Sequence, residues 1–364
     1  MIPVLRPAYL GEEAEAVREV LKSHWWGQGP KVEEFEEALA ARYKRKHCIA
    51  VNSCTAALHL AVLSHGIGPG DEIILPALTF VSTGLAVLYA GATPIFADVR
   101  PDTLTLDWDD VDQRITAKTK AVLPVDYAGY PAYDGGKENG ALTLPLIQDA
   151  AHSCGGTGYG LTVCLSFHPV KNLPSPDGGA ILTDDDAQAE RLRALRWCGI
   201  DRSTWARTGK TYTWDYDIAE VGYKCHWNDV AAAIALVHLR HLDEQNARRR
   251  EAAVYYTNNL VGVQLPVDHF HHTWHLYTIR VPAELRNGLI DDLAGKEIGT
   301  SVHYRPLTDY QPFHNTVSAS FGNGWPVTER EWRRLVTLPL YADITRQEQD
   351  HVIEAVNGHM EAHR

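Results

Sequence analysis

Short apolar runs alternate with helix-sized amphipathic segments along the first half of the chain. Strands are expected at residues 47–51, 72–75, 94–97, 120–124, 144–149, 163–167 and 179–183, and helical periodicity occupies residues 12–22 and 32–42. Apolar strands separated by helices are typical of a sheet that is covered on both faces. The pattern therefore predicts an α/β fold built on a mainly parallel seven-stranded sheet with helices on both faces.

The second half of the chain has a different spacing of apolar residues. From Trp227 the apolar spacing is helical, and one long helix is expected to continue to Asn259. A strand is expected at residues 276–281, a helix at 283–293, a short strand at 300–304 and a final helix at 347–363. We therefore expect a large α/β domain at residues 1–240 and a small α+β C-terminal domain at residues 241–364.

Composition narrows the class of protein. A chain of 364 residues that is 45% hydrophobic is long enough for a large core and a second lobe. The formal charge of −12 argues against a nucleic-acid-binding protein. No apolar run approaches the roughly 20 residues that span a bilayer, and the six cysteines lack a C-x-x-C spacing. We expect a protein of the reducing cytoplasm that binds neither nucleic acid nor membrane.

Candidate chemistry gathers in two motifs. The sequence QDAAH at residues 148–152 contains Asp149 and His152, and Lys171 follows nineteen residues later in SFHPVKN at residues 166–172. An acid at the end of a buried strand can keep a pyridine nitrogen protonated, and a lysine on a later loop can form an imine with an aldehyde. Taken singly, these residues would be an ordinary helix cap and a solvated loop lysine.

A third motif changes that interpretation. The expected strand that ends at Val51 runs into Asn52, Ser53, Cys54 and Thr55 and then into a helix. Backbone N–H groups at a helix N-terminus, together with small hydroxyl side chains, suit a phosphate dianion. The three motifs in this order predict a pyridoxal phosphate site.

On these motifs the chain resembles the DegT-type sugar aminotransferases, which are fold type I pyridoxal phosphate enzymes of the aspartate aminotransferase superfamily. Further segments of the family pattern are WWGQGPKV at residues 25–32, GDEIILPALTF at 70–80, GATP at 91–94, GG at 178–179, GYK at 222–224, LYTI at 276–279 and LPL at 338–340. The resemblance covers nearly the whole chain. It implies the fold, pyridoxal 5'-phosphate as the cofactor, and transamination as the reaction.

The resemblance also implies roles for single residues. Lys171 is expected to form the Schiff base and to move the proton at the reacting carbon, Asp149 to pair with the pyridine nitrogen, and His152 to lie beside the phenolic oxygen. The other expected cofactor contacts, around the ring and the phosphate, are Cys54, Thr55, Phe80, Ala151 and Ser166. The expected substrate contacts are Trp26, Gly27, His303, Tyr304 and Arg305.

Two segments depart from the family pattern. The family often has GYNYR where a segment reaches the partner subunit's phosphate, and this chain has GYKCH at residues 222–226. Lys224 or His226 could take that role in a homodimer with shared active sites, and the sequence leaves the choice open. The stretch at residues 153–165 is shorter than the corresponding loop of relatives, so a different substrate entrance is expected.

Three functions follow from these features. The leading interpretation is transfer of an amino group from glutamate or glutamine to a nucleotide-linked keto-sugar, because Lys171 is kept where the dehydratase branches of the family have a histidine. The alternatives are the same chemistry on a keto-cyclitol, and a non-catalytic pyridoxal phosphate-binding regulatory protein. The cations that could meet a diphosphate are Lys31, Arg202, Arg207, Lys210, Lys224 and Arg305.

A histidine-rich segment raises the alternative of a metal site. Residues 269–275 (HFHHTWH) are rich in histidine, and histidine clusters can bind zinc. The segment has no cysteine nearby, and its close carboxylate is Asp268. No metal is therefore expected.

Overall fold

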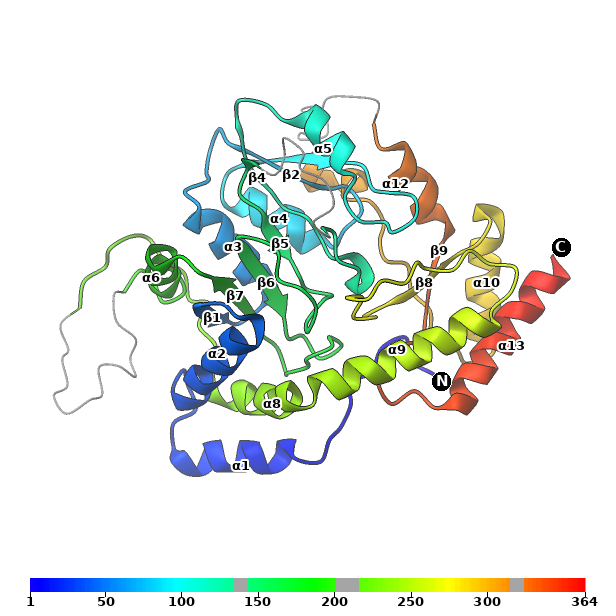
Figure 1. Ribbon diagram of the computed structural model, residues 1–364, viewed down its shortest axis with the longest axis horizontal. Coiled ribbons are helices and arrows are strands. Elements are labelled where there is room, and N and C mark those ends of the chain that lie inside the picture. Colours follow the sequence, from blue (N-terminus) through cyan, green and yellow to red (C-terminus); the bar gives the residue numbers. More distant parts are fainter. Residues whose placement is uncertain (134–142, 201–215, 315–323, 364) are drawn as a thin grey trace.

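Seven strands form the central sheet in the computed structural model, which describes residues 1–133, 143–200, 216–314 and 324–363 (Figure 1). They are β1 (His47–Val51), β2 (Glu72–Pro76), β3 (Thr93–Ala97), β4 (Thr119–Val122), β5 (Ile147–Asp149), β6 (Thr162–Ser166) and β7 (Gly179–Thr183). Ladders join β1-β7-β6-β5 and β3-β2-β4. Parallel bridges from Val122 to Leu146 and from Val125 to Asp149 connect the two groups. Of these described strands, β7 alone runs antiparallel to its neighbours, so the predicted mainly parallel sheet is confirmed.

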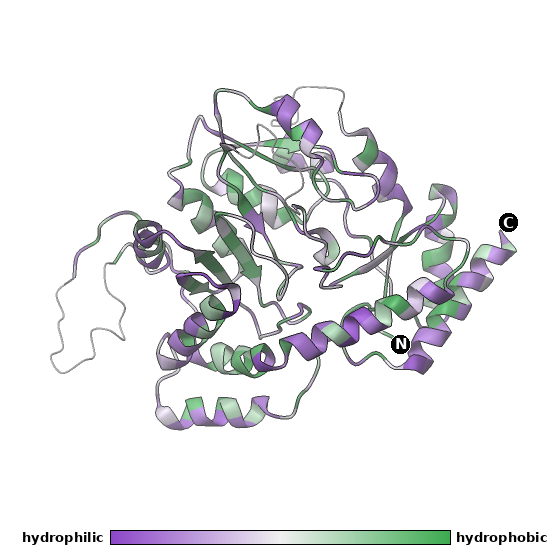
Figure 2. Ribbon diagram, viewed as in Figure 1, coloured by the Kyte–Doolittle hydropathy of each residue, from purple (hydrophilic) through white to green (hydrophobic). Residues whose placement is uncertain are grey.

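Helices cover both faces of this sheet. In the large lobe they are α1 (Glu13–Ser23), α2 (Pro30–Tyr43), α3 (Cys54–Ser64), α4 (Val81–Tyr89), α5 (Trp108–Arg114), α6 (Asp186–Leu195) and α8 (Asp229–Arg240), with the short helix η1 (Tyr127–Gly129). Alternate residues of β1 enter opposite cores: Ile49 and Val51 pack with α3, whereas Cys48 and Ala50 pack with α2 and α8. Figure 2 accordingly colours the central strands as the most apolar part of the ribbon.

The small lobe has its own core. Its elements are α9 (Leu242–Asn259), β8 (Tyr277–Arg280), α10 (Ala283–Gly295), β9 (Leu335–Leu338) and α13 (Arg346–Ala362), and β8 pairs antiparallel with β9. The first residues of the chain join this lobe, because Ile2 bridges to Ile298 and the Leu340 N–H donates to the Val4 carbonyl. An α+β C-terminal lobe is therefore present, and the boundary between residues 240 and 241 stays a prediction.

Segments between β8 and β9 in the chain return to the large lobe. They contain η3 (Leu307–Asp309), η4 (Gln311–Phe313), α12 (Pro326–Glu331) and η5 (Trp332–Arg334). Phe313 and Trp325 pack with Phe96 of β3, and Asp98 accepts hydrogen bonds from the N–H groups of Val327 and Thr328 at the start of α12. The carboxylate of Asp98 thus caps a helix that connects the two lobes.

Two local expectations were wrong. The helix expected to reach Asn259 is divided at His241, whose backbone angles of φ −102° and ψ 5° leave the α-helical region and whose ring contacts Glu12. The short strand expected at residues 300–304 is reduced to one bridge, between Ser301 and Thr337. The carbonyl of His303 instead accepts a hydrogen bond from the Tyr127 hydroxyl, so it is engaged outside a strand ladder.

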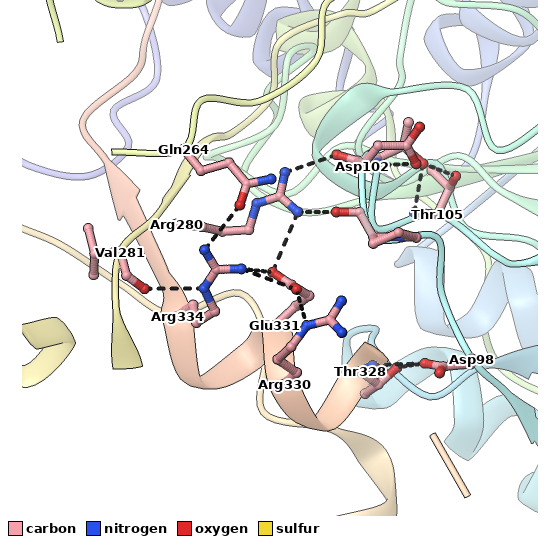
Figure 3. A network of polar contacts seen from close by, with 12 residues as sticks. Asp98, Asp102, Thr105, Gln264, Arg280, Val281, Thr328, Arg330, Glu331 and Arg334 are labelled. Carbon is pink, nitrogen blue, oxygen red and sulfur yellow. Dashed lines mark hydrogen bonds and ion pairs between the residues drawn. The ribbon is translucent and has the colours of Figure 1, made fainter. Parts of the chain in front are cut away.

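A buried carboxylate links the lobes at β8 (Figure 3). Glu331 is 2% exposed and pairs with three arginines, Arg280, Arg330 and Arg334. The Arg280 guanidinium, also buried, donates to the backbone carbonyl of Asp102 in the large lobe. Glu331 and Arg280 each neutralise the other's buried charge. Because Arg280 also contacts Asp102, it holds β8 against the loop that follows β3.

Candidate active site

A cavity of about 360 Å³ lies beyond the carboxyl ends of β5 and β6. These strands are parallel neighbours, so their ends meet at one edge of the sheet, where ligands of open α/β sheets bind. The sequence-predicted residues that line the cavity are Cys54, Thr55, Phe80, Asp149, Ala151, His152, Ser166, Lys171, His303 and Tyr304. Segments far apart in the chain therefore converge here.

Asp149 ends β5 with its carboxylate buried. Its Oδ2 accepts a hydrogen bond of 2.8 Å from Thr83 Oγ1, and its Oδ1 accepts one of 3.1 Å from the Ala151 N–H. Burial raises the pKa of Asp149, while these two donors and Lys171 act to lower it. A carboxylate held this way at a cavity wall stabilises a cation placed next to it.

Lys171 sits on the loop between β6 and β7. Phe167 anchors this loop, because its ring packs edge-on against Phe35 at 5.1 Å between centroids. The Lys171 Nζ atom lies 3.3 Å from Nε2 of His275. Burial lowers the pKa of Lys171 to about 8, against the influence of Cys54 and Asp149, which raise it. A substantial fraction of the amine is therefore neutral, and so nucleophilic, near pH 8.

His152 is held in one tautomer. Its Nδ1 accepts the N–H of Ala128 at 3.2 Å, so the hydrogen-bond pattern assigns the ring proton to Nε2. Nε2 in turn lies 3.0 Å from the hydroxyl of Tyr304. Burial, Lys171 and His303 lower the pKa of His152 well below its usual value, so the imidazole is neutral at pH 7.

The N-terminus of α3 also lines the cavity. Ser53 caps this helix, and the next two residues, Cys54 and Thr55, supply its first backbone N–H groups. Thr55 Oγ1 lies 2.7 Å from Ser82 Oγ, and Ser166 lines the same cavity. Helix N–H groups and hydroxyls at one point suit a phosphate group.

Gly179 allows the start of α3 to lie close to β7. It begins β7, and a Cβ atom at this position would lie 2.5 Å from the carbonyl carbon of Ser53 and 2.6 Å from the nitrogen of Cys54. Any side chain would push the start of α3 away from the sheet. The glycine of the GG motif therefore lets the backbone of the helix start approach β7.

A buried hub supports the turn at η1. Asp126 accepts hydrogen bonds from Gln148, Ser153, Tyr159 and the backbone of Ala132. Burial raises the pKa of Asp126 to about 6, while these donors act to lower it. The same Gln148 closes the short loop at residues 153–160, where its side-chain oxygen accepts the N–H groups of residues 159 and 160. This loop is thus tied to β5, and its shortness relative to the family stays a prediction.

Other predicted residues lie elsewhere in this chain. Trp26, Gly27 and His226 line a second cavity of about 440 Å³, which shares no lining residue with the first among the described residues. Lys224 Nζ lies 5.3 Å from the ring centre of Trp197, which also lines this second cavity. We call it the tryptophan cavity.

The remaining candidate cations make local contacts or are not described. Arg305 pairs with Asp309 at 3.0 Å and does not line the Lys171 cavity. Lys31 pairs with Glu34 at 2.6 Å. Arg202, Arg207 and Lys210 lie outside the residues that the structure describes.

Sequence reasoning missed two residues of the site. Thr83 lies inside α4, where nothing in the sequence distinguishes a threonine that contacts Asp149 from one that packs in the core. His275 was considered only as part of a histidine-rich segment, although it directly precedes the recognised LYTI motif. In the described ranges, no group of three or more His, Cys, Asp or Glu side chains could hold a metal ion.

The chemistry of the cavity fits pyridoxal phosphate. A partly neutral lysine can bond to the aldehyde, the Asp149 carboxylate can face the pyridine nitrogen, and the start of α3 can hold the phosphate. Phe80, whose side chain is half exposed to the cavity, and the small Ala151 leave space for a flat ring. Together with the sheet order, these features define a fold type I pyridoxal phosphate enzyme.

Comparison with known proteins gives the family. Residues 8–357 match the DegT/DnrJ/EryC1/StrS aminotransferase family, and the chain belongs to it. It is 36% identical to the spore coat polysaccharide biosynthesis protein SpsC of Bacillus subtilis over 376 aligned positions, which cover 98% of this chain and 96% of the relative. The predicted family, fold, cofactor and aminotransferase class are thereby confirmed.

Solved structures agree with this assignment. The PMP form of Spr1654 from Streptococcus pneumoniae superposes with a TM-score of 0.89 at 27% identity, covering 100% of both chains, and a PLP form of the same protein gives 0.87. The aminotransferase TlmJ of Streptoalloteichus hindustanus gives 0.88 at 30% identity, covering 100% of this chain and 99% of that one. Within the described residues, no helix is both long enough and apolar enough to cross a membrane.

Proposed function

We propose that the protein is a cytoplasmic homodimer that transfers an amino group from glutamate or glutamine to a keto-sugar carried on a nucleotide diphosphate. The observation that carries the amino transfer is the convergence of Lys171 and Asp149 in one cavity. Because the protein belongs to an aminotransferase family, the non-catalytic alternative is set aside. The same chemistry on a keto-cyclitol is kept as an outcome of the test below.

The bound cofactor supplies an aldehyde that condenses with amines and a ring that withdraws electrons. Lys171 would hold the cofactor through its Nζ, and the same amine, when it is free of the cofactor, would act as the base. With a pKa of about 8, this amine takes up a proton from the donor's α-carbon and returns it at another atom. The Asp149 carboxylate would keep the ring nitrogen of the cofactor protonated, which is the state in which the ring withdraws electrons.

Two neutral side chains, those of His152 and Tyr304, accompany the charged groups of the site. His152 donates its Nε2 proton toward the Tyr304 hydroxyl, and both side chains line the Lys171 cavity. We propose that this pair binds the oxygen substituent of the cofactor ring. Neither group carries a charge at pH 7. They would therefore orient the cofactor without disturbing the pairing between the Asp149 carboxylate and the protonated ring nitrogen.

Support for a sugar substrate comes from the relatives. SpsC is described as a spore coat polysaccharide biosynthesis protein, and Spr1654 as a sugar aminotransferase. A nucleotide diphosphate also needs aromatic surface and cations. The tryptophan cavity offers an indole at Trp26 that is 56% exposed, and Lys224 Nζ lies 5.3 Å from the ring centre of Trp197, which also lines this cavity.

Support for shared sites comes from His226. Its Nδ1 atom is buried and has no hydrogen-bond partner among the described residues. The backbone beside it is joined to the end of β1, since the Asn52 N–H donates to the Cys225 carbonyl at 2.8 Å, one residue before Ser53. We propose that in the dimer the tryptophan cavity faces the partner's Lys171 cavity, so that Lys224 or His226 reaches the partner's phosphate.

A substrate panel tests the proposed reaction. The purified protein with pyridoxal phosphate is incubated with glutamate or glutamine and with keto-sugars linked to uridine, thymidine or guanosine diphosphate, the ketone being at different ring positions. Mass spectrometry should detect an aminated nucleotide sugar. The matched control is Lys171→Met, which keeps the chain length and removes the amine.

The outcomes separate the candidates. Product from at least one nucleotide keto-sugar, absent with Lys171→Met, supports the proposal. Amination of a free keto-cyclitol with every nucleotide sugar left unchanged supports the alternative substrate and contradicts the nucleotide-sugar assignment.

A further inference from the structure

His275 is the last residue of the histidine-rich segment, and its side chain contacts Lys171. It lies two residues before β8, is 1% exposed, and lines the Lys171 cavity. Its backbone N–H donates to the Ala128 carbonyl at 2.9 Å, the same turn that donates to His152. The ring of His275 lies 4.5 Å from the ring of His152 between centroids. One turn thus positions both imidazoles beside the reacting centre.

The tautomer of His275 follows from a chain of amides. Asn246 donates from Nδ2 to the Cys154 carbonyl at 3.1 Å, so its oxygen accepts from Nδ2 of Asn172 at 2.8 Å. Asn172 Nδ2 also donates to the Thr273 carbonyl at 2.8 Å. A backbone carbonyl can only accept, so the two amides cannot be turned around.

The oxygen of Asn172 must therefore face His275. Asn172 Oδ1 lies 3.2 Å from His275 Nδ1, which makes Nδ1 the protonated nitrogen. Nε2 is left with its lone pair, and this atom is 3.3 Å from Lys171 Nζ. The imidazole presents an acceptor to the lysine, and not a second donor.

We propose that His275 is a positioning residue for Lys171. The lone pair on Nε2 of His275 accepts a hydrogen bond from the lysine amine whenever that amine is free of the cofactor. A neutral amine has two N–H bonds and one lone pair. With one N–H held by His275, rotation of the Nζ group is restricted, and the lone pair that takes up the substrate proton is held in a defined direction. The inference rests on the proposed role of Lys171.

The charge environment agrees with an acceptor role. The titratable and charged groups that face Lys171 and His275 are Cys54, Asp149, His152, Arg249 and His303. Burial and the neighbouring cations lower the pKa of His275 well below its usual value, so it does not protonate in competition with Lys171. A neutral acceptor stabilises the ammonium form of Lys171 more than the neutral form, because the hydrogen bond from an ammonium is charge-assisted.

Two amide variants separate the two ring nitrogens. In His275→Gln the side-chain oxygen can stand near the position of Nε2 and accept from Lys171. In His275→Asn the amide reaches only the position of Nδ1, so it keeps the contact with Asn172 and loses the lysine. His271→Asn is the matched control, since His271 is an exposed residue of the same segment and does not line the Lys171 cavity.

The main readout uses the protein without cofactor. Cyanate carbamoylates neutral amines, and peptide mass spectrometry gives the rate at Lys171 as a function of pH. We expect His275→Asn to lower the pH midpoint of Lys171 by about one unit, because the ammonium loses a charge-assisted acceptor. His275→Gln and His271→Asn should keep the wild-type midpoint.

Turnover and the tautomer give two further readouts. Donor turnover should fall about tenfold in His275→Asn and return to within about threefold in His275→Gln. Histidine-selective ¹⁵N spectra of the wild-type protein, assigned by the signal lost in His275→Gln, should show protonation at Nδ1. This last measurement is made on the wild-type protein, so it does not depend on the activity of any variant.

The results that overturn the proposal are specific. An unchanged or raised Lys171 midpoint in His275→Asn, or a His275 protonated at Nε2, contradicts it. If instead no nucleotide keto-sugar is aminated, the proposed substrate fails, while the cyanate and ¹⁵N measurements still report on Lys171 and His275. The two failures are therefore distinguishable.

Discussion

The Thr83 hydroxyl donates a hydrogen bond of 2.8 Å to Oδ2 of Asp149, from inside α4 to the end of β5. This contact is fully buried, and it acts to lower the pKa of a carboxylate that burial raises. In the proposed reaction Asp149 acts in its ionised form, which thus depends on a residue that does not itself line the Lys171 cavity.

Replacing Thr83 by valine should move the acid side of the pH profile. The variant keeps the shape of threonine and removes the donor, so the pKa of Asp149 rises further. Because Asp149 acts in its charged form, activity should be lost at a higher pH than in the wild type, by about one unit. Thr83→Ser keeps the hydroxyl and should restore the wild-type profile. An acid limb that does not move in Thr83→Val would separate Thr83 from the function of Asp149.

Replacing Asp149 by asparagine should preserve the fold and cripple turnover. The amide fills the same space without the charge that holds the ring nitrogen protonated. The loss of a charge-assisted contact alone costs on the order of 1.5–3 kcal/mol, which corresponds to roughly 10- to 100-fold in rate. Circular dichroism and thermal melting check the fold, and the amino transfer rate checks the chemistry. Near-wild-type turnover in a folded variant would remove Asp149 from the mechanism.

The arginine cluster around Glu331 should control stability and not chemistry. Glu331→Gln leaves the buried Arg280 guanidinium without its counter-charge, which should lower the free energy of unfolding by about 3–5 kcal/mol. Glu329→Gln changes an exposed residue of the same helix and should stay within about 0.5 kcal/mol of the wild type. Urea unfolding measures both. Equal stability of the two variants would mean that the link between the lobes does not depend on this carboxylate.

Hybrid dimers test the proposal that each site is completed by the partner. Protomers with Lys171→Ala are mixed with protomers changed at both Lys224 and His226 to alanine. One site of each hybrid dimer then has every proposed group intact, so mixing should restore part of the activity that both parents lack. Hybrids that form without recovering activity, or an active monomer, would place all cofactor contacts within one chain.

The outline of the site was readable from the sequence because it depends on strand ends. Asp149 and Lys171 follow neighbouring parallel strands, so the order of the motifs alone brings them to one edge of the sheet. The start of α3 was predictable for the same reason, since a short strand leads directly into it. Local spacing suffices when the fold converts it into proximity.

The rest depended on contacts between distant segments. His275 is 104 residues from Lys171 in the chain, and its protonated nitrogen is defined by two asparagines and two backbone carbonyls. Residues 300–304 were expected as a strand, although His303 and Tyr304 instead line the cavity. Trp26 was expected to contact the substrate and His226 was a candidate for the partner's phosphate, and both line the tryptophan cavity of their own chain. No periodicity in the sequence encodes such contacts.

The most direct test of the central claim is to identify the lysine that carries the cofactor. The protein with bound pyridoxal phosphate is reduced with borohydride, digested and mapped by mass spectrometry. Lys171 should carry the reduced cofactor, because its amine has a pKa of about 8 and lies in the cavity that contains Asp149. Prior treatment with glutamate should prevent the labelling, since the donor releases the lysine. Labelling of another lysine, or of none while the cofactor is bound, would contradict the assignment.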